Sequence, residues 1–263
     1  MVVINPNTLL NMISGNDFLN KAYKILAKDA EVQTLWVMSN IMAVNRLRYN
    51  DHGPVHAHIA AGASLYLYQL LLSRNIQPTL IKNGVVDNVE YTWLVPLYGA
   101  LLHDIGNSVH RDMHEKMGVF LAKPILDRVL RKLIPDPFAR VKVRQEILHA
   151  IYCTSYEVEC LTIEAGCVKV GDGLDMAEGR ARIPYKLGEI SIHSVSALSI
   201  RSVEIVPGDN CPIRVNVYMN ERAGVFQIDE ILIPKINTTM LRDYIEVYAI
   251  IGDNILKTYS PRK

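Results

Sequence analysis

The segment YGALLHDIGNSVHRDMHE, residues 98–115, constrains the fold more than any other part of the sequence. An apolar run that ends in Leu102 leads directly into His103 and Asp104. Such a run belongs in a hydrophobic core, where an imidazole and a carboxylate are costly unless other groups pair with them. The sequence therefore predicts a helix whose end carries polar side chains into the interior, opposite further polar groups.

Length and composition are those of a globular protein. The chain has 263 residues, of which 49% are hydrophobic, enough for one large domain or for one domain with a smaller second one. The formal net charge is +1, so composition indicates no general affinity for nucleic acid or for anionic membranes. The four cysteines form no CxxC pair, and we expect reduced thiols in a cytoplasmic protein.

One long uncharged segment, residues 53–73, resembles a membrane span by its lack of Asp, Glu, Lys and Arg. It contains Pro54, His56 and His58, and the next uncharged run is too short to span a bilayer. We therefore predict buried core helices and no membrane segment.

Helical signals fill about the first 185 residues. Asp29 can cap a helix, Pro54 suits a first helical turn, and Asp87 with Glu90 resembles a capping box. Pro96 should kink the helix that follows. The expected helices cover about 29–49, 54–74, 87–102, 110–132, 137–153 and 162–178.

The pattern changes after residue 190. Segments 202–206, 213–219 and 244–251 are rich in β-branched residues and predict strands, and 226–236 predicts a helix. Three strands make no robust sheet alone, so they must pack on the helices, pair with a second chain, or both. We predict a mostly α fold, with a helical domain over 1–187 and a small α/β domain over 188–263.

Histidines and carboxylates that suit metal ligation recur along the helical part. His52 and His56 are four residues apart and share a face if the helix extends back that far, as do His110 and His114. Histidine with carboxylate suits Mn, Fe or Zn, and Mg where more oxygen ligands are present. The remaining candidates are His103, Asp104, His149, Asp172 and Asp175.

The order of these residues resembles the HD-domain superfamily of metal-dependent phosphohydrolases. The motif ALLHDIGN is preceded by DHGPVHAHIAAGA and followed by VGDGLDMAEGR, and the resemblance covers about residues 45–185. It implies a helical bundle in which His56, His103, Asp104 and Asp172 are metal ligands. The Asp104 carboxylate would bridge two ions in a dinuclear site.

The resemblance implies one or two divalent ions per chain. His114 and His149 are similar to the histidines that bind a second ion in dinuclear members, although core or surface packing is open to both. His110 competes with His114 for that role. His52 resembles the histidine that protonates the leaving oxygen in cyclic-nucleotide phosphodiesterases of the superfamily; it can instead cap a helix or contact a metal ligand without binding the ion.

Substrate-binding residues are less clearly marked. Many members have a lysine, which would contact phosphate, where this chain has Asn107. Arg180 and Arg182 can bind phosphate bidentately or simply end a helix in solvent. Asp175 can orient a ligand histidine, contact substrate or lie on the surface, and His110 is a further candidate.

The implied activity is hydrolysis of a phosphomonoester or phosphodiester, with phosphorylated small molecules and nucleotides as substrates and a homo-oligomer as the assembly. Two alternatives stay open: a di-iron oxygenase of the myo-inositol oxygenase type, which is similar in fold and ligand order, and a nucleotide sensor without catalysis. The C-terminal region lacks the basic stripe and interleaved aromatics of a nucleic-acid binder.

Overall fold

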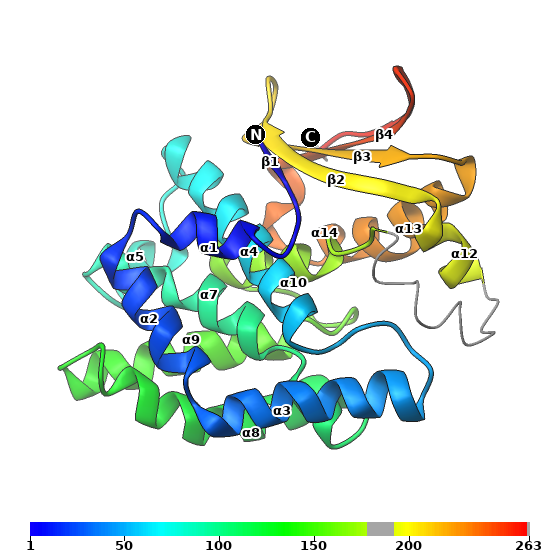
Figure 1. Ribbon diagram of the computed structural model, residues 1–263. Helices are drawn as coiled ribbons and strands as arrows, with labels where there is room; N and C mark the ends of the chain where they lie inside the picture. Colours follow the sequence, from blue (N-terminus) through cyan, green and yellow to red (C-terminus); the bar gives the residue numbers. More distant parts are fainter. Residues whose placement is uncertain (178–191, 262–263) are drawn as a thin grey trace.

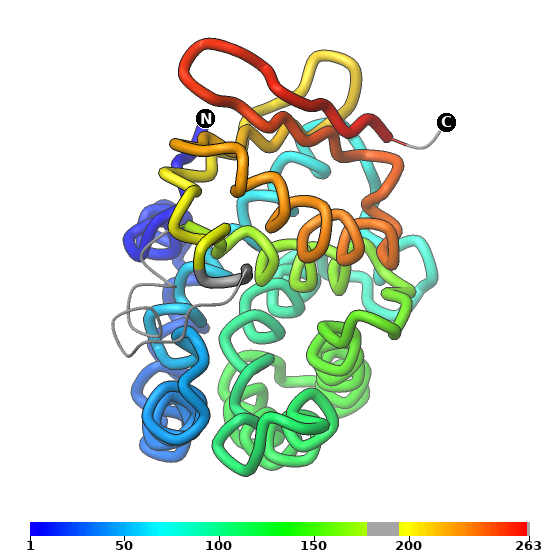
Figure 2. The backbone as a smooth tube through the Cα atoms, turned by 90° about the vertical axis from the view of Figure 1, so that its right-hand side faces the viewer, coloured from blue at the N-terminus to red at the C-terminus, as the bar shows by residue number. Residues whose placement is uncertain are grey.

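The structure is a computed structural model and describes residues 1–177 and 192–261. Helices form most of it, and a five-stranded sheet lies as a layer over one side of the helical bundle (Figures 1 and 2). The predicted fold class, a helical domain with a small C-terminal α/β part, is confirmed. None of the helices in the described residues has the length and apolar character needed to cross a membrane.

The helices of the bundle agree with the predicted segments, with shorter bounds. The two earliest helices and the short helix at Thr79–Lys82 were not predicted. The helix begun by Asp29 continues past Asn40 as a π-helical turn to Arg46. The bundle consists of α1 (Thr8–Ile13), α2 (Asp17–Ala27), α3 (Ala30–Asn40), α4 (Pro54–Ser73), α5 (Thr79–Lys82), α6 (Val89–Thr92), α7 (Leu94–Leu102), α8 (His114–Leu130), α9 (Pro137–Tyr152) and α10 (Ile163–Gly173).

Three local expectations need correction. The cap of α6 is Asn88, not Asp87, because the Asn88 side chain accepts the N–H of Glu90. The predicted helix over 87–102 is interrupted at Trp93, upstream of Pro96, and continues as α7. The last helix of the bundle ends at Gly173, so Asp175 lies in the turn that follows it.

Helix α4 is the centre of the molecule. Its first turn begins with Pro54, and apolar residues then cover all of its sides. Ala57, Ala61 and Leu65 belong to the core of the helical bundle, whereas Leu67 and Leu71 belong to the core beneath the sheet. The uncharged segment is therefore a helix buried between two cores.

Glycines allow the helices that carry the motif to approach closely. A Cβ on Gly171 of α10 would lie 2.2 Å from Ser64 Oγ of α4, and a Cβ on Gly106 would lie 1.9 Å from the carbonyl oxygen of His114. These contacts leave no room for a side chain. They bring α4, α8 and α10 against the turn that contains His103 and Asp104.

The sheet has the order β1-β2-β3-β4-β5. Strands β3 and β4 are parallel and the other neighbouring pairs are antiparallel. The three predicted strands are confirmed, and β1 and β5 were not predicted. The strands are β1 (Val2–Val3), β2 (Ile200–Pro207), β3 (Ile213–Met219), β4 (Ile245–Ile251) and β5 (Asn254–Tyr259).

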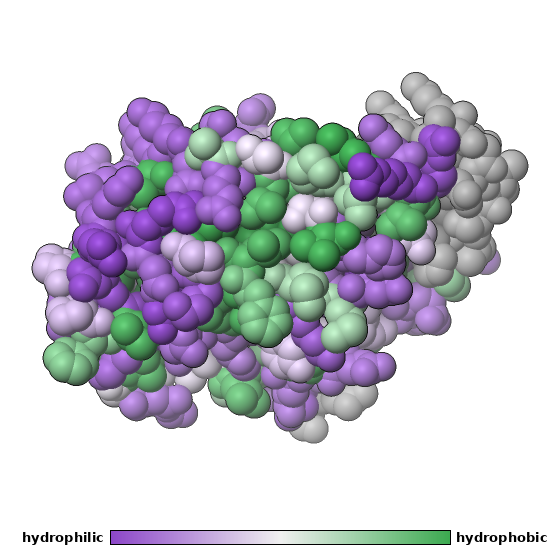
Figure 3. All heavy atoms as spheres, turned by 90° about the horizontal axis from the view of Figure 1, so that it is seen from below, coloured by the Kyte–Doolittle hydropathy of each residue, from purple (hydrophilic) through white to green (hydrophobic). Residues whose placement is uncertain are grey.

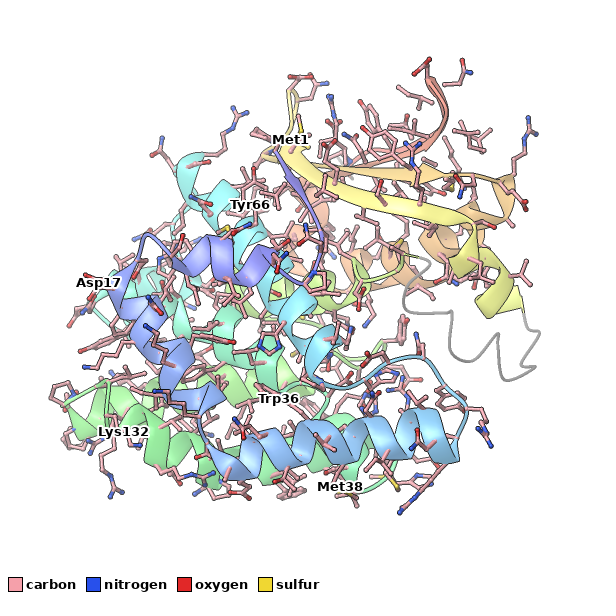
Figure 4. All side chains as sticks on the ribbon, viewed as in Figure 1. Met1, Asp17, Trp36, Met38, Tyr66 and Lys132 are labelled. Carbon is pink, nitrogen blue, oxygen red and sulfur yellow. The ribbon has the colours of Figure 1, made fainter. Side chains whose placement is uncertain are left out.

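Short helical segments join the strands and pack against α10. The predicted helix over 226–236 is confirmed as α13 (Val225–Gln227), a π-helical turn and α14 (Ile233–Asn237); α12 (Ile192–Leu198) precedes β2. Strand β1 comes from the start of the chain, where the amino group of Met1 donates to Tyr66 Oη at 2.8 Å (Figure 4). The sheet layer thus includes residues from both ends of the sequence.

Candidate metal centre

Helix α3 fixes the end of α7 from which the motif emerges. Trp36 Nε1 donates to the Leu101 carbonyl at 2.7 Å, and Ser39 Oγ donates to the Asp104 carbonyl at 3.1 Å (Figure 4 labels Trp36). The last carbonyls of a helix have no partner within the helix. Because α3 supplies these donors, the chain can end α7 inside the protein with His103 and Asp104 buried.

Four side chains from three helices converge on one point. His56 Nε2 lies 3.2 Å from His103 Nε2 and 3.1 Å from Asp172 Oδ1. Asp104 Oδ2 lies 3.4 Å from the Nε2 atoms of both histidines. His56 belongs to the first turn of α4, His103 and Asp104 follow α7, and Asp172 lies in the last turn of α10.

The other ring nitrogens of the two histidines are held by oxygen acceptors. His56 Nδ1 donates to Asp175 Oδ2 at 2.7 Å, and His103 Nδ1 donates to the Ala100 carbonyl at 2.7 Å. Such partners fix the tautomer and turn Nε2 toward a metal, as they do in histidine metal sites generally. The position of Asp175 is that of a group that orients a ligand histidine.

The electrostatics of this cluster favour a cation. Burial acts to raise the pKa of Asp104, but His103 and His52 hold it well below the usual range. Burial acts to lower the pKa of His103, but Asp104 and Asp172 raise it to about 10. Two ionised carboxylates in a buried site therefore call for positive charge, which a divalent ion would supply.

The distances fit a bound ion. Ligand atoms at about 2.0–2.2 Å from zinc are about 3–3.5 Å from one another in tetrahedral or octahedral geometry. The five separations that involve His56 Nε2 or His103 Nε2 are 3.1–3.5 Å. In the described residues, two groups of side chains have ligand atoms close enough to hold a metal ion: His56, His103 and Asp172, and His52, His56 and Asp104.

A family profile described as HD domain matches residues 96–177, which include His103, Asp104 and Asp172. The uncharacterized protein MJ1020 of Methanocaldococcus jannaschii is 44% identical over 227 residues, which cover 86% of this chain and 87% of that protein. The chain belongs to the HD-domain family. No solved structure matches the chain.

His52 lies beside the four candidate ligands of this HD centre and belongs to the second group, with His56 and Asp104. Its Nδ1 lies 2.6 Å from Asp104 Oδ2, and its Nε2 lies 3.1 Å from Asn50 Oδ1. The helix does not extend back to His52, because α4 begins at Pro54 and Gly53 is extended, so His52 does not share a helix face with His56. His52 reaches Asp104 from the segment before the helix.

Asn107 occupies the position where many HD proteins have lysine. Its Nδ2 donates to Asp104 Oδ1 at 2.9 Å, and its Oδ1 accepts from Arg111 Nη1 at 3.3 Å. Asp104 therefore directs Oδ2 toward the four-ligand cluster and Oδ1 toward Asn107. The amide does not supply the charge of a lysine, but it holds Arg111 close to the centre.

His114 lies on the Oδ1 side of Asp104, with its Nε2 3.6 Å from that atom. Its Nδ1 donates to the Arg111 carbonyl at 2.9 Å, and its Nε2 accepts from Arg111 Nη1 at 3.1 Å. Burial, joined by Arg111, lowers the pKa of His114 despite Asp104 nearby. His114 is thus a neutral acceptor next to the cluster and belongs to neither of the two ligand groups.

His149 has other partners. Its Nε2 accepts the N–H of Leu161 at 3.1 Å, and its Nδ1 lies 3.4 Å from Cys153 Sγ. A hydrogen bond from Cys160, together with His149, lowers the pKa of Cys153 to about 5 despite burial. His149 thus lies in a cluster with the thiols of Cys153 and Cys160. It is in neither of the groups of described residues that can hold a metal ion.

Among the remaining candidates, His110 is not brought to the centre. His110 precedes α8 and has an exposed side chain, whose Nδ1 accepts the N–H of Asp112. The expected helix over 110–132 begins only at His114, after Met113 in the left-handed region with φ of 59°. Arg180 and Arg182 lie outside the described residues.

Lys235 is a polar group at the HD centre that sequence analysis missed. It comes from α14, in the α/β part, and its Nζ lies 2.6 Å from Asp172 Oδ2 and 3.4 Å from the Thr154 carbonyl. Lys235 and His103 hold the pKa of Asp172 well below its usual range although burial acts to raise it. The HD helices and the α/β part therefore meet at a metal-ligand candidate.

Proposed function

We propose that the protein is a divalent-metal-dependent phosphohydrolase that acts on a phosphomonoester or phosphodiester, with nucleotides among its substrates. The proposal depends on one observation: the Nε2 atoms of His56 and His103 face each other at 3.2 Å, with their Nδ1 atoms held by acceptors and two carboxylates beside them. Family membership adds support, since HD domains are metal-dependent phosphohydrolases as a class.

In this proposal His56, His103, Asp104 and Asp172 hold a divalent ion of Mn, Fe, Zn or Mg. Such an ion supplies Lewis acidity, which lowers the pKa of water and neutralises phosphate oxygens. The protein fixes the geometry: Asp175 orients His56, the Ala100 carbonyl orients His103, and Lys235 holds the second oxygen of Asp172. Ligands fixed in this way need little rearrangement during the reaction.

His52 is the proposed acid for the leaving oxygen. Its Nδ1 contacts Asp104 Oδ2, so the ring lies next to the place where the ion and the substrate phosphorus would be. Because the nitrogen faces a carboxylate, it does not need to be a metal ligand. A histidine at this distance can deliver a proton to a departing alkoxide.

The oxygenase alternative has less support. A di-iron centre would need His114 and His149 as ligands in addition to the four-residue cluster. Both Nε2 atoms accept hydrogen bonds from other groups, Arg111 Nη1 and the Leu161 N–H respectively. No described contact favours oxygen chemistry over hydrolysis, and we retain the hydrolase.

A metal-supplemented screen against phosphoesters tests this proposal. Purified protein with Mn, Fe, Zn or Mg is assayed against nucleoside monophosphates, cyclic nucleotides and nitrophenyl phosphates, with Asp104→Ala as the inactive control. Turnover that Asp104→Ala abolishes supports the hydrolase. Tight nucleotide binding without turnover under every metal would favour the sensor instead.

Assembly and location are further proposals. Helices α3 and α8 form the lower face in Figure 1, and the view from below shows apolar side chains among hydrophilic ones (Figure 3). Exposed apolar residues on these helices include Val37 and Phe120. We propose a homo-oligomer, to be tested by light scattering, and a cytoplasmic location, which four free cysteines favour.

A further inference from the structure

Asp104 divides the centre into two sides. Its Oδ2 atom contacts His52, His56 and His103, the side on which the four candidate ligands converge. Its Oδ1 atom accepts from Asn107 Nδ2 at 2.9 Å and faces His114 Nε2 at 3.6 Å. A second ion held by Asp104 and His114 would use this Oδ1 side.

On the Oδ1 side, both atoms that would bind a second ion already accept hydrogen bonds. Oδ1 accepts from Asn107, and His114 Nε2 accepts from Arg111 Nη1 at 3.1 Å. A flipped Asn107 amide would lose two hydrogen bonds. Its Oδ1 accepts from Arg111, and its Nδ2 also donates to the Asp104 carbonyl at 3.0 Å. Asp104, Asn107, Arg111 and His114 form one connected network.

The backbone holds this network rigidly. Gly106 lies against the start of α8 with no room for a side chain, and His114 Nδ1 donates back to the Arg111 carbonyl. Met113 adopts the left-handed conformation with φ of 59°, which is uncommon for a residue other than glycine. Strain of this kind persists where the surrounding structure imposes it and is frequent at functional sites.

Arg111 keeps donors for a ligand. It is half-buried, and in the described residues both of its side-chain hydrogen bonds come from Nη1. The N–H groups of Nη2 and Nε remain available, and a guanidinium binds phosphate oxygens in a planar, two-point geometry that an ammonium lacks. Its positive charge lies next to His114, one contact from Asp104.

We propose that Arg111 binds the phosphoryl group of the substrate and is the second positive centre of the site, so that the protein works with a single divalent ion. Arg111 thereby replaces the charge of the lysine that Asn107 does not provide. The part of the proposal that concerns substrate rests on the proposed phosphohydrolase function. The part that concerns the ion depends only on the contacts of Asp104 and His114.

The test counts ions and measures phosphate binding, and it needs no turnover. Mn²⁺ per chain is measured by elemental analysis for wild type, His114→Ala and the double variant Arg111→Ala/His114→Ala, with Arg131→Ala at the exposed end of α8 as a control. We expect one ion per chain in all four. Two ions in wild type and one in His114→Ala would make His114 a ligand and overturn the proposal.

Inorganic phosphate binding to the Mn²⁺-loaded proteins is then measured by calorimetry. We expect His114→Ala to bind phosphate about as well as wild type, and the double variant to bind about ten-fold more weakly or worse, since a charge-assisted contact is lost. Equal affinities in these two variants would remove Arg111 from phosphate binding. A failed phosphoester screen with phosphate binding that depends on Arg111 would contradict the hydrolase and leave the role of Arg111 intact.

Discussion

Lys235 Nζ and Asp172 Oδ2 form a buried ion pair of 2.6 Å between residues 63 apart in the sequence. The lysine stem passes over Gly173, where an added Cβ would lie 3.0 Å from Lys235 Cδ. Its ammonium also lies 4.7 Å from the centre of the Tyr156 ring. The α/β part thus supplies a fixed positive charge at the edge of the metal centre.

Replacing Lys235 by methionine tests this pair. Removal of one partner leaves Asp172 buried without its nearest cation, which typically costs roughly 3–5 kcal/mol. Lys235→Met should therefore strongly lower the melting temperature of the chelator-treated protein. Because a bound ion replaces part of the lost charge, added Mn²⁺ should raise the melting temperature of this variant more than that of wild type. Calorimetric scans with and without Mn²⁺ measure both quantities.

The matched control is Lys257→Met, which breaks an exposed pair with Asp229. Exposed pairs contribute about 0–1 kcal/mol, so this variant should melt close to wild type in both conditions. If Mn²⁺ raised the melting temperature of Lys235→Met less than that of wild type, the main role of Lys235 would be to orient Asp172 for ligation and not to balance its charge.

The helical bundle could be predicted because its signals are local. Asp29 and Pro54 begin helices as expected, since a cap and a fixed φ act within one turn. The HD motif placed His103 and Asp104 at a buried helix end for the same reason. Strand β5 gave no such signal, because most of its side chains are exposed and show no alternation.

Long-range contacts decided the rest of the site. Lys235 lies in an apolar helical segment, and nothing near it in the sequence indicates a partner in α10. His149 was expected near the metal, but the loop after α9 returns to place the Leu161 N–H on its Nε2. His52 does not lie on the helix face of His56, because the backbone at Gly53 is extended. Such contacts depend on packing and not on spacing.

Asp104→Ala is the direct test of the metal centre. Asp104 Oδ2 is within 3.4 Å of His56 and His103, so the substitution removes a charged candidate ligand from the middle of the cluster. We expect most bound metal and all metal-dependent turnover to disappear, as measured by elemental analysis. Asp112→Ala, on an exposed side chain beside His110, should keep its metal. Wild-type metal content in Asp104→Ala would reject the ligand assignment.

Glu164 should make stability depend on pH. Its side chain is fully buried, Oε1 accepts the N–H of Leu80, and Oε2 has no hydrogen-bond partner among the described residues. Burial raises the pKa of Glu164 to about 7. A raised carboxyl pKa favours the protonated folded state, so stability is lost as pH rises from about 4.5 to about 7, by roughly 3 kcal/mol.

Glu164→Gln removes this titration. Urea unfolding at pH 5 and pH 8 should show the variant close to wild type at the lower pH and more stable at the higher one. Glu157→Gln, on an exposed side chain, serves as the control and should leave the free energy of unfolding unchanged at both pH values. A difference between Glu164→Gln and wild type that is the same at both pH values would mean that Glu164 does not titrate in this range.

His52→Ala separates acid catalysis from metal binding. His52 Nδ1 faces a carboxylate oxygen of Asp104 and its Nε2 faces Asn50, and His52 is not one of the four proposed ligands. The variant should therefore keep its metal and have a lower kcat, whereas His56→Ala should lose metal.

An acid matters most when the departing oxygen is a poor leaving group, because it then needs a proton. We expect a loss of about 100-fold or more with alkyl phosphates and a much smaller loss with nitrophenyl esters. His110→Ala, an exposed histidine, should behave as wild type with both. Equal losses across the series of leaving groups would exclude His52 as the acid, and lost metal would place it among the ligands.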